Sequence, residues 1–340
     1  MRIAPAVLTL ALPLCAPIHG QTLLVVNQGN STLSLVDPAT NQQIAAIAEN
    51  TPGVHAHEAA VTPDGRTAFL PIYGSTGVGK PGIDGAQMLI LDIPSRTITA
   101  RVDFGHGVRP HQPTYDASTG LLYVTTELDQ AITVIDPKTH AIVAKVPTGQ
   151  PESHMLAISH DGRRGYTANV GPGTVSVLDL AAHKTLAIIP VAPTVQRISI
   201  SNDDKLVFTS DYSQPRLAVI DTATNKVKTY IPLPGLGYGS APTPDGRYLL
   251  LAIPTVTKPA GAGSGPSGGQ IAVIDLRTLT LARTIDVPSA PQEVLIPPGG
   301  TTAYVSCNAT GKVAVLDIPS LSLRTTIAAG PGADGLAWAK

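Results

Sequence analysis

One unit of sequence recurs seven times along this chain of 340 residues, and this recurrence constrains the fold more than any other feature. Its clearest copy is GYTANVGPGTVSVLDLAAHKTLAIIP, residues 165–190, a pattern that predicts three short strands separated by tight turns. Four of the six gaps between successive copies lie within two residues of 43, and the two longer gaps contain insertions. An aspartate that ends the second of these strands marks each copy: Asp37, Asp92, Asp136, Asp179, Asp221, Asp275 and Asp317.

A period near 40 residues with several strands in each unit is typical of a β-propeller, whose four-stranded blades pack around a central channel. A fourth strand precedes the other three in six copies, and it starts ten residues before the next strand in each. The first copy, Thr22–Ile47, has only three strands, and GADGLAW at residues 332–338 resembles the missing one. The sequence therefore predicts an all-β, seven-bladed β-propeller whose first blade is closed by the C-terminal strand.

The marker aspartates open short turns such as DPAT, DIPS and DTAT. An Asp side chain at this place caps the backbone that follows it. Because a residue present in every copy cannot mark one site, we expect these aspartates to be structural.

Three segments, YVTTELDQAITVIDPKTHAIV, YTANVGPGTVSVLD and YVSCNATGKVAVLD, resemble the repeat of the YVTN-repeat β-propeller family, which includes YncE-like exported proteins. The resemblance covers essentially all of the chain after its first 20 residues. More distantly, it extends to propeller lactonases. It implies the propeller fold and export, but no particular activity, because one fold supports many functions.

The amino terminus has the composition of a secretory signal peptide. Arg2 precedes an apolar run that prolines interrupt, and the small residues Ala16 and Gly20 stand near plausible cleavage points. We predict a signal peptide at residues 1–20, a single propeller domain at residues 21–340, and a periplasmic or secreted protein. No later segment reaches about 18 uninterrupted apolar residues, so we do not expect a membrane-embedded protein.

The formal net charge is −1, without a basic run, and aromatic residues make up only 4% of the chain. The sequence thus shows neither a row of basic residues that could bind a phosphate backbone nor a set of aromatic residues on which bases could stack. Nucleic acid is therefore not an expected partner. A small ligand or a protein of the cell envelope remains as a partner, and we expect a monomer.

The candidate site lies where the innermost strands begin. Equivalent first positions around the ring carry His57, His111, His154, Gln196, Tyr238, Gln292 and, through the proposed closure, Asp334. Two residues earlier stand His55, Arg109 and Glu152, and one residue later stand Glu58 and Arg197. Polar and ionisable residues are thus expected to crowd one sector of one rim of the channel.

Three imidazoles at one level suggest a metal centre with His57, His111 and His154 as ligands, since imidazole suits Cu, Zn or Fe. Glu127, just after the second strand of the third blade, could complete the shell or orient a histidine. Two other interpretations stay open: an organic ligand held by the same residues without metal, and a water-filled channel mouth without any ligand.

The functional expectation is an exported propeller that binds a metal ion, a small ligand or a partner at this rim. The alternative is an enzyme, a lactonase-like hydrolase or an oxidoreductase. In that version Glu58, Glu127 or Glu152 accepts a proton, and Arg109 or Arg197 stabilises developing negative charge.

Two insertions accompany the rim. Gly74–Lys80 matches G-x-x-x-x-G-K, but Pro81 replaces the Ser or Thr of a phosphate-binding loop and no helix is predicted to follow, so we interpret the match as chance. This loop and the glycine-rich Pro254–Gly269 both join the second and third strands of a blade. We expect them to rise beside the rim and to wall a site there.

Overall fold

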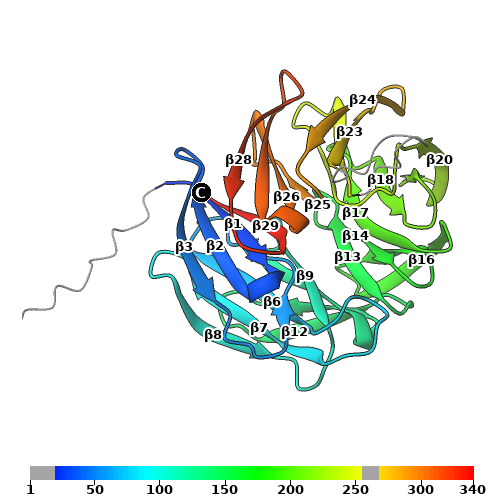
Figure 1. Cartoon of the computed structure of the whole chain (residues 1–340). Coiled ribbons are helices and arrows are strands. Elements are labelled where there is room, and N and C mark those ends of the chain that lie inside the picture. The colour runs from blue at the N-terminus through cyan, green and yellow to red at the C-terminus, as the bar shows by residue number, and fades with distance from the viewer. Residues whose placement is uncertain (1–19, 255–267) are drawn as a thin grey trace, which may run out of the picture.

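The computed structural model describes residues 20–254 and 268–340, which form seven antiparallel sheets arranged as blades around a central channel (Figure 1). This confirms the predicted seven-bladed β-propeller. Within the described residues the helices are three short 3₁₀ turns, η1 (Gln28–Asn30), η2 (Glu127–Asp129) and η3 (Asn308–Thr310). None of the described helices has the length and apolar character needed to cross a membrane.

Within each blade the strands lie in chain order from the channel outward, except that the last strand of the chain is innermost in blade 1. Blade 1 contains β29 (Ala333–Ala339), β1 (Thr22–Asn27), β2 (Thr32–Asp37) and β3 (Gln42–Ala48). In blade 2 the inner strand is split into β4 (His55–Ala56) and β5 (Ala60–Val61), followed by β6 (Thr67–Gly74), β7 (Asp84–Asp92) and β8 (Thr97–Asp103). Blade 3 contains β9 (Pro110–Asp116), β10 (Leu121–Thr126), β11 (Ala131–Ile135) and β12 (Ile142–Pro147).

The remaining blades repeat this order. Blade 4 contains β13 (Ser153–Ile158), β14 (Arg164–Asn169), β15 (Thr174–Asp179) and β16 (Lys184–Pro190). Blade 5 contains β17 (Val195–Ile200), β18 (Leu206–Asp211), β19 (Arg216–Asp221) and β20 (Lys226–Pro232). Blade 6 contains β21 (Ser240–Pro242), β22 (Tyr248–Ile253), β23 (Gly269–Asp275) and β24 (Thr280–Val287), and blade 7 contains β25 (Pro291–Leu295), β26 (Thr302–Cys307), β27 (Lys312–Asp317) and β28 (Ser322–Ala328).

The last strand closes the ring as predicted. β29 pairs antiparallel with β1, with Thr22 opposite Ala339 and Asn27 opposite Ala333, and Figure 1 shows the two ends of the described chain side by side there. Gly335 of β29 also donates its N–H to the carbonyl of His57 at 2.9 Å. A Cβ at Gly335 would lie 2.3 Å from that oxygen, so only glycine permits this approach to blade 2.

The predicted role of the marker aspartates is confirmed. Each accepts hydrogen bonds from groups two or three residues later, as Asp37 does from the N–H of Ala39 at 2.8 Å and Asp221 from that of Thr224 at 2.9 Å. Four residues after each aspartate the backbone turns through a left-handed conformation. The seven residues there, all with positive φ, are Asn41, Arg96, His140, His183, Asn225, Leu279 and Leu321.

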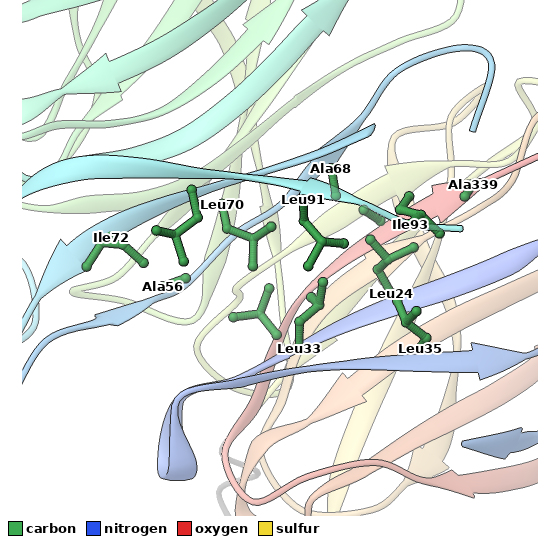
Figure 2. Packing of buried hydrophobic residues seen from close by; sticks show 13 residues of the cluster. Leu24, Leu33, Leu35, Ala56, Ala68, Leu70, Ile72, Leu91, Ile93 and Ala339 are labelled. Carbon is green, nitrogen blue, oxygen red and sulfur yellow. The ribbon is translucent and has the colours of Figure 1, made fainter. Parts of the chain in front are cut away.

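Apolar clusters lie between adjacent blades and hold the ring together. Figure 2 shows the cluster between blades 1 and 2, where Leu24, Leu33 and Leu35 of blade 1 face Leu70 and Leu91 of blade 2. Comparable clusters fill each of the other six interfaces between neighbouring blades. Because every blade buries side chains against both neighbours, the sheets can leave polar residues at the narrow inner ends facing the channel.

The first testable expectation concerns closure. Leu336 of β29 is buried in the cluster between blades 7 and 1, so we expect Leu336→Ala to lower the free energy of unfolding by roughly 2–5 kcal/mol. The matched control is Leu323→Ala on the outer strand β28, where the side chain is exposed. Urea denaturation measures both variants, and equal stability of the two would contradict closure through β29.

Candidate functional site at the channel rim

The register of the sheets places the predicted rim residues at one level. In six blades the residue just before the rim position pairs with the sixth residue of the second strand: Ala56 with Ile72, Pro110 with Thr126, Ser153 with Asn169, Val195 with Asp211, Pro291 with Cys307 and Ala333 with Asn27. Asp334 thus occupies in blade 1 the position that His57 and His111 occupy in blades 2 and 3. The equivalence inferred from the ten-residue spacing holds in the register of these six blades.

The imidazoles of blades 2, 3 and 4 form one packed cluster. The ring centroids of His57 and His111 are 5.2 Å apart, and those of His111 and His154 are 3.6 Å apart at an interplanar angle of 34°. His55 stacks on the outer side of His57 at 5.1 Å. Tyr73 lies against His57, His111 and His154 at 4.7, 5.0 and 5.7 Å.

Glu127 orients two members of this cluster through hydrogen bonds. One of its carboxylate oxygens bonds Nδ1 of His154, and the other accepts the hydroxyl hydrogen of Tyr73 at 2.9 Å. Only 2% of Glu127 is exposed, so both bonds are shielded from solvent. A carboxylate beside Nδ1 favours the tautomer in which Nδ1–H donates to it, and in that tautomer Nε2 of His154 carries the lone pair.

A second group of charges crosses the channel. Arg197 of blade 5 bonds Glu58 of blade 2, and it donates from Nη2 to Asp334 of blade 1 at 3.2 Å. In a ring of seven, blade 5 lies opposite the seam between blades 1 and 2, so the Arg197 side chain spans the channel. Tyr238 covers the guanidinium at 4.8 Å, and Gln28 holds the other oxygen of Asp334.

Burial shifts the protonation of this group. It raises the pKa of Asp334 to about 7 and that of Glu58 well above its ordinary value, and it also raises the pKa of Glu293. Burial, together with neighbouring imidazoles and the Arg197 charge, lowers the pKa of His57 and His111 well below their ordinary value. These shifts favour the neutral form of His57 and His111 and the protonated form of the three carboxyls.

Four buried polar atoms at this rim have no hydrogen-bond partner among the described residues: Nε2 of His57, Nδ1 of His111, Oε1 of Gln196 and Nε of Arg197. A buried polar atom without a partner costs about 1–3 kcal/mol. These four atoms belong to residues at one level of the channel, where a ligand could form the missing hydrogen bonds.

Arg109 and Glu152 lie outside the imidazole cluster. The Arg109 guanidinium binds Asp84 at 2.5 Å and the carbonyls of Lys80 and Gly77 at 2.7 and 3.3 Å, so it anchors the loop 75–83 beside the rim. The carboxylate of Glu152 accepts the N–H of Gly171 at 2.7 Å. Both groups are engaged in holding loops.

The loop 75–83 does join the second and third strands of blade 2 beside the rim, as expected of the first insertion. Most of the second insertion, Pro254–Gly269, lies outside the described residues, as do residues 1–19 of the predicted signal peptide. Gln292 occupies its rim position with its backbone carbonyl bonded to the N–H of Gly239 at 3.0 Å.

The three histidines do not form a preorganised metal centre. Within the part of the chain that the structure describes, no group of three or more His, Cys, Asp or Glu side chains is placed to hold a metal ion. The packing gives the reason, because the His111 and His154 rings lie against each other with centroids 3.6 Å apart, and Nδ1 of His154 is bonded to Glu127. The imidazoles meet as predicted, but as a packed cluster.

Comparisons with known proteins agree with the fold. A profile of the cytochrome D1 heme domain matches residues 117–248, less than half of the chain. Hydrazine synthase of Kuenenia stuttgartiensis superimposes with a TM-score of 0.68 at 18% identity, over 85% of this chain and 90% of that one. Dihydro-heme d1 dehydrogenase NirN in complex with DHE superimposes with a TM-score of 0.63 at 15% identity, over 93% of this chain and 74% of that one.

The chain has the fold of these β-propellers. At such low identity the similarity extends to the fold alone, and the search of curated proteins gives no match.

Sequence reasoning missed Tyr73, Gln28 and Glu293. The repeat contained the signal for all three, because Tyr73 and Gln28 stand six residues after the start of the second strand of their blades, as Glu127 does. Glu293 follows a first-position residue, as Glu58 and Arg197 do. Aligning every column of the repeat would have found them.

The raised pKa of Asp334 gives a pH dependence of stability. The folded protein keeps a proton on Asp334 that the unfolded chain loses near pH 4. The stabilisation that this proton gives to the folded state is therefore complete below pH 4 and is lost as the pH rises to about 7. Asp334→Asn should remove about 4 kcal/mol of pH dependence over that range.

Urea unfolding of wild type and variant at pH 4.5 and pH 8 measures this difference. Glu49, with its pKa also raised to about 7 by burial, contributes equally to both proteins and cancels. The control is Asp317→Asn in an exposed turn. In this variant the free energy of unfolding should still fall from pH 4.5 to pH 8 as it does in wild type. An unchanged pH dependence in Asp334→Asn would show that Asp334 titrates normally.

Proposed function

We propose that this chain is an exported propeller of the YVTN/YncE-like type that binds a small polar ligand at the channel rim formed by His57, His111, Gln196 and Arg197. One observation carries the proposal: these residues come from three blades, and each presents a buried polar atom without a partner among the described residues. Such atoms are rare in folded proteins unless water or a ligand meets them.

The rim is also shielded and rigid, which suits selective binding. His111 is only 1% exposed, and Arg197 is held by carboxyls from the opposite side of the channel. The loop 75–83, fixed by Arg109, adds a wall on the imidazole side. A ligand would therefore meet side chains already held in place, which lowers the entropic cost of binding.

The d1 heme named in two of the comparisons does not fit this rim. An unpartnered imidazole nitrogen would suit an axial position of iron. However, the rings of Tyr73, His111 and His154 already pack at 3.6–5.7 Å, which leaves no slot between them for a flat macrocycle. The cations that would bind its carboxylates, Arg109 and Arg197, are already bonded to acidic side chains. A tetrapyrrole therefore has no part in the proposed function.

Thermal unfolding in the presence of small amines, acids, polyols and metal salts tests the proposal. We expect at least one compound to raise the unfolding temperature of wild type and of the control His183→Phe, an exposed turn residue, but not of His111→Phe. Produced with its first 20 residues in a bacterial host, the exported protein should begin near Gln21. If no compound distinguishes His111→Phe from the control, ligand binding at the rim is excluded.

The Glu127–His154 pair favours one second candidate, a hydrolase. A buried carboxylate that fixes the tautomer of an imidazole leaves the other ring nitrogen as a general base for water. The expected stabilisation of negative charge by Arg109 or Arg197 has no support, since their guanidinium groups are bonded to Asp84, Glu58 and Asp334.

Hydrolysis of a lactone series, followed by pH-stat, tests this candidate. Glu127→Gln should lower kcat by about 10²- to 10⁴-fold, because it removes the acceptor that orients His154. The control Asp317→Asn alters a carboxylate in an outer turn, away from the rim, and should keep the wild-type rate. Equal rates in wild type and Glu127→Gln would remove the pair from any catalytic role.

A further inference from the structure

The unpartnered atoms at the rim are mostly hydrogen-bond acceptors, and His111 shows this most clearly. Burial and the neighbouring imidazoles lower the pKa of His111, which favours its neutral form. Its Nδ1 is buried and has no partner among the described residues. With the proton on Nε2, this nitrogen accepts a hydrogen bond.

Two further acceptors lie at the same level. Nδ1 of His57 faces Oδ2 of Asp334 at 3.9 Å, which favours the proton on that nitrogen and leaves a lone pair on Nε2. The amide oxygen of Gln196, a residue only 7% exposed, is the third. An ammonium group has three N–H donors and no acceptor, so it complements such a set.

The acidic groups around these acceptors also favour a cation. One guanidinium, that of Arg197, is bonded to the buried carboxyls of Glu58 and Asp334 and has the half-buried Glu293 as a further acidic neighbour. Acidic groups outnumber basic ones in a region shielded from solvent, where charges interact strongly. The rings of Tyr73, His57 and His111 add polarisable faces beside the same position.

One atom differs in character. Nε of Arg197 is a donor without a partner in the described part of the chain. It requires an oxygen or nitrogen acceptor, which an ammonium group does not have. A ligand that satisfies all four atoms therefore carries both a positive amine and a neutral acceptor.

We propose that the rim binds a small primary amine in its ammonium form with a neighbouring hydroxyl or carbonyl oxygen, such as a short amino alcohol. This inference rests on the proposed function and names its ligand class. His57, His111 and Gln196 accept the ammonium hydrogens, a rim carboxyl that is protonated in the free protein ionises and balances its charge, and Arg197 donates to its oxygen.

Two other ligand classes match the rim less well. An anion would find one unpartnered donor that is always protonated, beside three carboxyls. A metal ion would need three ligands converging on one point, and the described residues contain no such group.

Isothermal titration of the full chain with four compounds on one skeleton tests the proposal. Ethanolamine carries the ammonium and hydroxyl groups, ethylene glycol replaces the ammonium by a neutral hydroxyl, choline keeps the charge without N–H donors, and glycolate carries a negative charge. We expect saturable binding of ethanolamine at a stoichiometry of one and at least tenfold weaker binding of the other three.

Variants assign that binding to the rim. His111→Phe keeps a ring but removes the Nδ1 acceptor, and Gln196→Leu removes the amide oxygen. Each should weaken ethanolamine binding at least tenfold, whereas His183→Phe, in an exposed turn, should bind as wild type does. Circular dichroism identifies which variants are folded, and either folded rim variant decides the result.

Several outcomes would overturn this inference. Equal binding of choline and ethanolamine would remove the role of the acceptors, and preferred binding of glycolate or ethylene glycol would reverse the ligand class. Stoichiometric Cu²⁺ or Zn²⁺ that depends on His111, without ethanolamine binding, would assign the rim to a metal. If the rim prefers glycolate, ethylene glycol or a metal ion, the proposed function as a ligand site stands and only the ligand class is wrong. The proposed function itself fails if no compound in the thermal screen distinguishes His111→Phe from its control.

Discussion

Closure of the ring by β29 is the constraint on which the rest of this molecule depends. The strand completes the sheet of blade 1, and its Leu336 fills the interface with blade 7. It also delivers Asp334 to the channel, where Arg197 arrives from the opposite side. Fold and candidate site are thus coupled, because the rim has its full set of side chains only when the first and last described strands have paired.

The charged group at the rim is buried within the channel. Arg197 spans the channel, and it is buried together with Glu58 and Asp334. Removing these charges from water is costly, and one guanidinium cannot neutralise three ionised carboxyls. This cost is smaller because burial favours the protonated form of Asp334 and Glu58 and the neutral form of His57. Stability alone gives little reason to retain such an arrangement, which supports the proposal of a ligand site at the rim.

Most of the fold follows from the sequence, since the repeat gives the number of blades, the strand order and the closing strand. The candidate site was predictable only in part. Positions along the repeat bring His57, His111, His154 and Asp334 to one level, but the spacing does not determine how their rings meet. The overlap of His111 with His154 depends on the bond from His154 to Glu127, and on Tyr73 filling the space beside them. Such contacts join blades far apart in the chain, and no local pattern encodes them.

The seven copies within one chain also separate structural from functional residues. The marker aspartate and the left-handed residue that follows it recur in every blade, because each outer turn has the same backbone requirement. The first and second positions of the inner strand differ from blade to blade, although six of the blades share the same register there. If backbone geometry dictated these residues, they would be alike in all seven blades. Instead they differ, and the ionisable ones lie mainly on one side of the ring. Such differences are expected if a nearly symmetric fold is to bind a ligand that has no such symmetry.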